Sequence, residues 1–225
     1  MYTYDAFLRA VAKFPAFCGD SNSPNGLNLA DTCKRELAAI FSIMNHVSSG
    51  FTQSGANCAT GVDCARGPLG LVGDLKYRAF SKAFYEGYDR SQELVDNPER
   101  VATDGYVALA SAIWLWTAKH TIGPSVHNVM AGWFVPNDGD LQAGHTAGFG
   151  TAMFSLSKAD CTAWSETRNA KAMIAKFTEY EGVLGLAADT THLGCKRMWA
   201  DFAWSGSSNK LIYFAEGNWG TSMCK

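Results

Sequence analysis

The segment from Tyr106 to Thr117, YVALASAIWLWT, constrains the fold more than any other stretch of the 225-residue chain. Apolar residues fall on every side of the helix that it would form, which predicts a helix inside the core rather than on the surface. No apolar run in the chain approaches the roughly 18 to 20 residues of a transmembrane span. We therefore expect a central buried helix and no membrane-spanning segment.

The overall composition is that of a globular protein, with 47% hydrophobic, 18% charged and 12% aromatic residues. The length fits one domain, or one domain of two lobes, with enough residues to bury a core. A net charge of −2 provides no concentrated basic face for nucleic acid or for an anionic membrane. We expect neither as a partner.

Helical spacing of apolar residues predicts further helices around the central one. Asp31 or Thr32 is expected to cap a helix over 33–45, and Ser165 a closing helix over 165–186. The other predicted helices are short and cover 4–14, 77–85, 126–133 and 151–156. The pattern indicates a mainly α protein with long loops.

Seven cysteines occupy positions that suit disulfides across loops, and therefore an oxidising, extracellular setting. A zinc site is the alternative, but no CxxC pair or neighbouring histidine cluster supports it, so we expect no metal and no cofactor. Cys224 is left over and predicts an intermolecular bridge, or else a buried or free thiol. The disulfide candidates are Cys18 and Cys33, Cys58 and Cys64, and Cys161 and Cys195.

Four segments of the chain resemble the family 19 glycoside hydrolases, the plant-type chitinases, and the likeness extends over residues 2–199. The four segments are RELAAIFSIMNHVSSG (35–50), RGPLGL (66–71), NPERVATDGYVALASAIWLW (97–116) and PSVHNVMAGWFVPNDGDLQAGHTAGFG (124–150). The resemblance implies a two-lobed, lysozyme-like, mainly α fold with a substrate cleft between the lobes. It also implies a Cys161–Cys195 disulfide, a chitinase-like domain over 1–199 and a C-terminal extension over 200–225.

The predicted site departs from the family pattern at its centre. The family's general acid is the glutamate after the histidine of the first segment, and here that position is Val47. Family 19 enzymes invert the anomeric centre, and inversion also needs a second carboxylate as the general base. The segment that carries the base shrinks to 51–65, whose single carboxylate, Asp63, is expected to be a turn residue. Other polar family positions are replaced by Gly70, Val72, Lys76, Ser157 and Met173.

The loss of these groups predicts a chain that is not an enzyme: a secreted, catalytically inactive chitinase-like protein with a role in binding or structure. Its partner would be a chitin-like glycan or a protein, with self-assembly through the tail as one version. The candidates for ligand binding are Tyr77, Trp133, Lys76 and Arg66, together with the tail aromatics Trp204, Tyr213 and Trp219.

The alternative is an active chitin or chitooligosaccharide hydrolase with a rebuilt site. Such a site needs two carboxylates, for which the candidates are Asp63, Asp74 and Glu86. His46 and His127 match family positions and are expected to be buried, hydrogen-bonded residues rather than catalysts.

Overall fold

The computed structural model describes residues 1–23, 26–55, 58, 61–118 and 123–202. The chain divides into two compact units. Of the described residues, unit 1 contains 1–17 and those of 47–118, and unit 2 contains 18–46 and 123–202. The tail aromatics and Cys224 lie outside the described residues, so the predictions about the extension remain predictions.

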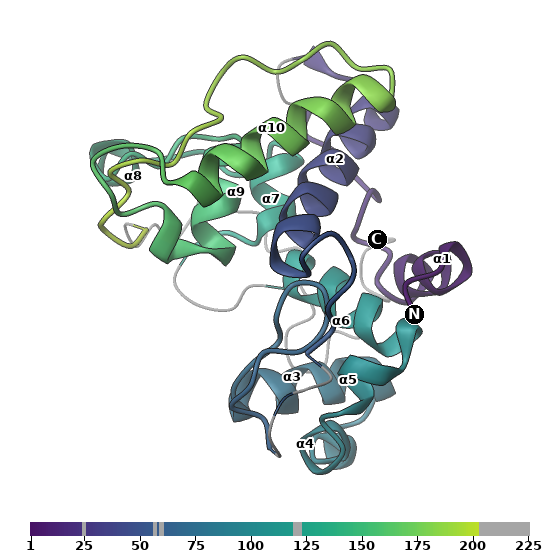
Figure 1. Cartoon of the computed structure of the whole chain (residues 1–225). Helices are drawn as coiled ribbons and strands as arrows, with labels where there is room; N and C mark the ends of the chain where they lie inside the picture. The colour runs from purple at the N-terminus through teal and green to yellow at the C-terminus, as the bar shows by residue number, and fades with distance from the viewer. Residues whose placement is uncertain (24–25, 56–57, 59–60, 119–122, 203–225) are drawn as a thin grey trace. The chain divides into compact units, whose positions relative to one another are not determined.

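Helices form the framework of both units (Figure 1). In unit 1 they are α1 (Tyr4–Lys13), α3 (Asp74–Tyr85), η2 (Tyr88–Arg90), α4 (Glu93–Asp96), α5 (Arg100–Thr103) and α6 (Gly105–Thr117). In unit 2 they are α2 (Leu29–Val47, whose last residue belongs to unit 1), α7 (Val126–Met130), α8 (Asp138–Gln142), α9 (Phe149–Leu156), η3 (Lys158–Asp160) and α10 (Arg168–Val183). The described residues contain no strand, only an isolated antiparallel bridge between Arg66 and Leu71. The mainly α prediction is confirmed.

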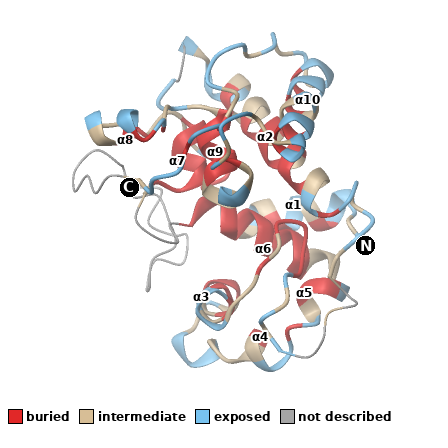
Figure 2. Ribbon diagram, turned by 60° about the vertical axis from the view of Figure 1, so that its left-hand side comes forward, coloured by how far each residue is buried: buried red, intermediate tan, exposed pale blue. Residues whose placement is uncertain are grey.

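Helix α6 is the core of unit 1, as its sequence predicts. The Asp104 carboxylate accepts hydrogen bonds from the first N–H groups of the helix and caps its N-terminus. Every residue of α6 after Tyr106 is buried, which Figure 2 shows as a red helix. Trp114 packs on Phe80 of α3 with ring centroids 5.6 Å apart, and Trp116 is fully buried. Both tryptophans therefore serve packing.

Two contacts join the long helices of unit 2. Arg35 of α2 donates to the buried Glu181 of α10, with Nε and Oε1 2.9 Å apart. Phe149 of α9 stacks on Phe177 of α10 with ring centroids 4.3 Å apart. Helix α10 begins at Arg168, where Thr167 and not Ser165 supplies the cap. The Ser165 prediction is wrong because the chain turns first through the bonds from the Thr167 hydroxyl to Asp160.

The start of α2 and the end of α7 also differ from the prediction. Asn28 accepts from the N–H of Asp31 at 2.8 Å, so the helix begins at Leu29 and neither Asp31 nor Thr32 is its cap. Helix α7 stops at Met130 because the N–H groups of Trp133 and Phe134 both turn back to the carbonyl of Asn128.

The three predicted disulfides are confirmed. They join Cys18 to Cys33, Cys58 to Cys64 and Cys161 to Cys195. Such bonds fit an oxidising compartment. Within the part of the chain that the structure describes, no helix is long and apolar enough to cross a membrane.

Candidate active site

Val47, which the sequence resemblance aligns with the family's general acid, is the last residue of α2 and is 38% exposed. It faces the turn between Arg66 and Leu71. A Cβ added to Gly70 of that turn would lie 3.7 Å from Val47 Cγ1 and 3.5 Å from Ala65 Cβ. The side chain at this position is aliphatic and packs close to the turn.

Arg66 holds the segment that precedes this turn in place. Its side chain is buried and donates to the carbonyls of Gly61 at 2.6 Å and Cys64 at 3.3 Å. Its backbone pairs with Leu71 in both directions, at 3.0 and 2.7 Å. Because Asp63 lies between the two carbonyls that Arg66 binds, the guanidinium positions the segment that carries this carboxylate.

Tyr77 is the third partner of Arg66. Its hydroxyl lies 3.5 Å from the guanidinium, and the ring is fully buried on α3. Burial raises the pKa of Tyr77, and the hydrogen bond with Arg66 opposes that shift. A buried ring has no face on which a sugar could stack, so Tyr77 and Arg66 support the loop rather than form a ligand surface.

The structure brings two of the three candidate carboxylates into one neighbourhood. The N–H of Gly73 donates to the carbonyl of Val62 at 2.8 Å. Asp63 and Asp74 each follow one of these bonded residues in sequence, and both are exposed. Asp74, in the first turn of α3, accepts from Arg78 Nε at 2.6 Å.

Glu86 is separated from this pair. It caps the C-terminus of α3 and forms an ion pair with Lys13. At 1.5 Å per residue, the twelve residues of α3 place it about 18 Å along the helix from Asp74. Glu86 therefore cannot act on the same bond as Asp63 and Asp74.

The remaining sequence-predicted positions are dispersed. Lys76 is exposed on α3, and Val72 is half-buried before it. Ser157 ends α9, where its N–H bonds to the carbonyl of Met153. Met173 is fully buried on α10.

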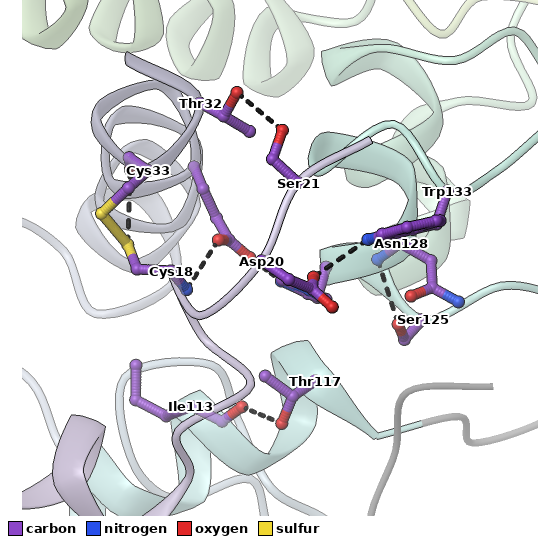
Figure 3. A network of polar contacts seen from close by, with 12 residues as sticks. Cys18, Asp20, Ser21, Thr32, Cys33, Ile113, Thr117, Ser125, Asn128 and Trp133 are labelled. Atoms are coloured by element: carbon purple, nitrogen blue, oxygen red, sulfur yellow. Dashed lines mark hydrogen bonds and ion pairs between the residues drawn. A yellow bond between two sulfur atoms is a disulfide. The ribbon is translucent and has the colours of Figure 1, made fainter. Parts of the chain in front are cut away.

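A buried charged cluster in unit 2 contains the candidate residue Trp133 (Figure 3). The Ser125 side chain caps α7 and so places His127 in its first turn. His127 Nδ1 lies 2.6 Å from Glu36 Oε1, and its Nε2 lies 3.0 Å from Asp20 Oδ1. The half-buried Trp133 donates from Nε1 to the same Asp20 oxygen at 2.9 Å.

The pKa of His127 depends on its position between two carboxylates. Burial lowers its pKa, but Glu36 and Asp20 more than offset this and raise the pKa from 6.5 to about 9. Glu36 also accepts from the N–H of Cys18 at 3.0 Å. The prediction that His127 is a buried, hydrogen-bonded residue is confirmed, whereas His46 is only half-buried.

Sequence reasoning missed both acidic partners of His127. Asp20 stands in a polar stretch that reads as loop, and Glu36 falls in the first half of a predicted helix. Neither carboxylate has a histidine three or four residues further along the chain, so the local sequence gives no indication that they pair with one. Only the fold could place them against a residue 91 and 107 positions away.

Unit 2 also contains a small pocket of about 170 Å³. It is smaller than the roughly 300 to 1,000 Å³ of most ligand pockets. Its Arg35 already binds Glu181 and the carbonyl of Ala187. The lining residues are Leu27, Arg35, Val129, Met130, Gly132, Phe134, Ala147, Gly148 and Asp189.

Among the described residues, no group of three or more acidic, histidine or cysteine side chains is placed to hold a metal ion.

Comparison with known proteins assigns the chain to a family. The sequence profile of the family described as "Chitinase class I" matches residues 53–195, which is more than half of the chain. The chain belongs to the family 19 glycoside hydrolases. Chitinase 8 of Oryza sativa subsp. japonica is 36% identical over 163 residues, covering 66% of this chain and 58% of the rice protein. An acidic endochitinase of Petunia hybrida is 34% identical and covers 66% of this chain and 59% of its own length.

Solved structures confirm the fold. Chitinase C from Streptomyces griseus HUT6037 superposes with a TM-score of 0.63 at 22% identity, covering 86% of this chain and 74% of that one. A family 19, class IV chitinase from Zea mays gives a TM-score of 0.59 at 23% identity, covering 87% of each chain. The family 19 chitinase fold predicted from the four sequence segments is therefore shown.

The prediction that the chain is not an enzyme is contradicted by these findings. Its relatives are named chitinases and endochitinases, and its structural neighbours are chitinases, which points to a hydrolase. The chain spans less than two thirds of the length of the rice and petunia relatives.

Proposed function

We propose that this protein hydrolyses the β-linked N-acetylglucosamine chains of chitin, with Asp63 and Asp74 as its two working carboxylates. Membership of the chitinase family supports the substrate class. The observation that supports the assignment is the backbone bond between Gly73 and Val62, because these two residues directly precede two exposed aspartates in the unit that contains Val47.

The roles follow from the contacts of each carboxylate. A general base must accept a proton from water, and Asp74 already accepts from Arg78, so we assign it as the base. Asp63 then protonates the leaving oxygen as the glycosidic C–O bond breaks and water attacks the anomeric carbon. Inversion of the anomeric centre follows if the two carboxyl groups stand about 6.5 to 9.5 Å apart.

Arg66, Tyr77 and the Cys58–Cys64 disulfide act on this site by positioning. Arg66 binds the carbonyls on both sides of Asp63, Tyr77 buttresses the guanidinium, and the disulfide closes the same segment. We propose that the protein works outside the cell or in another oxidising compartment, where this disulfide persists.

Chitohexaose cleavage tests the proposal. Micromolar protein should shorten the hexamer, as read by mass spectrometry, with the α-anomer as the first product by proton NMR. Asp63→Asn and Asp74→Asn should each lower kcat by about 10² to 10⁴. Glu86→Gln is the matched control, since Glu86 is an exposed, ion-paired carboxylate that caps the C-terminus of the same helix, and should leave kcat unchanged. Absence of any shortened product at high protein concentration would overturn the proposal.

A second variant tests the assignment of the acid. Val47→Glu places a carboxylate at the family's acid position on a side chain that is 38% exposed. With Asp63 as the acid, this substitution should change cleavage less than tenfold. A gain of 100-fold or more, together with full activity in Asp63→Asn, would show that Asp63 is not the acid.

A further inference from the structure

Two exposed tryptophans lie together in unit 2, whereas the candidate carboxylates belong to unit 1. Trp164 is 71% exposed and Trp199 is 53% exposed. Their ring centroids lie 5.3 Å apart, and the ring planes meet at 68°. The guanidinium carbon of Arg197 lies 4.8 Å from the centroid of the Trp164 ring. Contiguous exposed apolar surface with a polar rim is a feature of binding sites.

The two rings are held by a rigid base. The Cys161–Cys195 disulfide joins the segments that carry them. Backbone bonds run from Arg197 N–H to the carbonyl of Ala163 at 2.9 Å and from Met198 N–H to the carbonyl of Cys161 at 3.0 Å. A surface that is ordered before binding loses little conformational entropy when its ligand arrives.

Backbone conformation adds to this rigidity. Arg197 has a φ of +64°, a left-handed conformation that a non-glycine residue adopts only when its surroundings impose it. The conformation turns Arg197 so that its side chain lies over Trp164, while the buried Met198 anchors the next residue, Trp199. The fold therefore tolerates backbone strain in a segment that keeps these side chains at the surface.

We propose that Trp164 and Trp199 form a surface site of unit 2 that binds a chitin chain, whereas the proposed catalytic carboxylates belong to unit 1. Sugar rings present apolar C–H faces that stack on indoles, and their hydroxyl and acetamido groups bond to a polar rim. Arg197 and the exposed Lys196 supply that rim. The choice of chitin as the occupant rests on the proposed function.

The size of the surface favours a sugar chain over a protein. A tryptophan buries about 150 to 250 Å² in a contact. Two rings therefore fall short of the roughly 800 Å² per partner of a stable protein interface. An area of two rings suits one or two sugar residues, and the planes of the two indoles meet at 68° in an edge-to-face pair.

Adsorption to insoluble chitin tests the site, with the full chain and its alanine variants compared by depletion from solution. Trp164→Ala and Trp199→Ala should each raise the apparent Kd about tenfold. The double variant should bind more weakly than either single variant. Trp164→Phe should recover part of the affinity, because a ring remains for stacking.

The matched control is Tyr88→Ala in unit 1. Tyr88 is 52% exposed and has Lys82 Nζ 5.0 Å from its ring centroid, which is the same pairing of an exposed ring with a cation. This variant should adsorb like the wild type. All variants should keep the wild-type unfolding midpoint, because the substituted rings are exposed.

Two readouts separate this site from the hydrolase proposal. The double variant should cleave soluble chitohexaose at the wild-type rate while losing adsorption to the polymer. If no variant cleaves the hexamer, the hydrolase proposal fails, while loss of adsorption in the tryptophan variants alone still supports the site. Three results would each overturn the tryptophan site. They are wild-type adsorption by the double variant, an equal loss of adsorption in Tyr88→Ala, and binding of the wild-type protein to phosphatidylserine vesicles but not to chitin.

Discussion

Each unit contains a buried polar network built on a residue of a family motif, and the two networks differ in what they hold. In unit 2, His127 lies between the carboxylates of Glu36 and Asp20, and its charge is neutralised inside the protein. In unit 1, Arg66 binds backbone carbonyls on both sides of Asp63 and so orders an exposed carboxylate. The His127 network stabilises the interior of unit 2, whereas the Arg66 network holds the segment that carries the exposed Asp63.

This difference shows why motif residues are poor guides to the proposed active site of this chain. Arg66 and His127 both match the family, and both are buried. Their contacts hold neighbouring segments of the chain in place. The residues that we propose to contact a substrate, such as Asp63 and Trp164, are instead exposed.

The largest effect is expected from breaking the His127 network. Glu36→Ala would leave a buried imidazolium with one partner and the Cys18 N–H without its acceptor. Removal of one partner from a buried ion pair costs about 3–5 kcal/mol. Urea unfolding, followed by circular dichroism, should show a loss of this size.

Glu179→Ala is the control for this variant. Glu179 is an exposed acid of α10 that pairs with the exposed Lys176, and its loss should leave the urea midpoint unchanged. Equal stability of Glu36→Ala and the wild type would mean that the network stabilises nothing, and the contrast between the units would disappear.

A somewhat smaller effect is expected from pH. The folded-state pKa of His127 is raised from 6.5 to about 9, so its protonation contributes stability that is fully present below pH 6.5 and is lost as pH rises through 9. A shift of this size corresponds to about 3 kcal/mol. Unfolding free energies measured between pH 6 and 10 should fall accordingly, and His127→Gln should flatten the profile. An unchanged slope in this variant would assign the pH dependence to other groups.

The smallest effect on stability is expected in unit 1, where it should be joined by a loss of activity. Replacement of Cys58 and Cys64 by serine opens a short loop with a sequence separation of 6, which should cost about 2 kcal/mol. Because the same loop carries Asp63, chitohexaose cleavage by the folded variant should fall at least tenfold.

The Cys161–Cys195 disulfide provides the comparison for that variant. It closes a longer span, with a sequence separation of 34, so its loss should cost more stability. Cleavage of the soluble hexamer should nevertheless stay at the wild-type level while the protein is folded. If the two disulfide variants lose activity equally, the loop around Asp63 has no special role in catalysis.

The sequence alone determined the helical class, the buried α6, the three disulfide pairs and the family. These features depend on local patterns: apolar residues around one helix, cysteines at loop ends and ordered motifs such as that over 97–116. The helix caps were less predictable, because several neighbouring polar side chains could serve. Asn28 and Thr167 do so only where the preceding turn brings them to the open N–H groups.

The tertiary structure decided which side chains meet. Glu36 and Asp20 reach His127 across 91 and 107 residues, and the disulfide between Cys161 and Cys195 brings Trp164 beside Trp199. Burial of Tyr77 was likewise invisible in the sequence, since a tyrosine on a helix suits a core and a sugar site equally. Contacts between distant residues depend on how whole helices pack, and side-chain periodicity reports only which face of each helix is apolar.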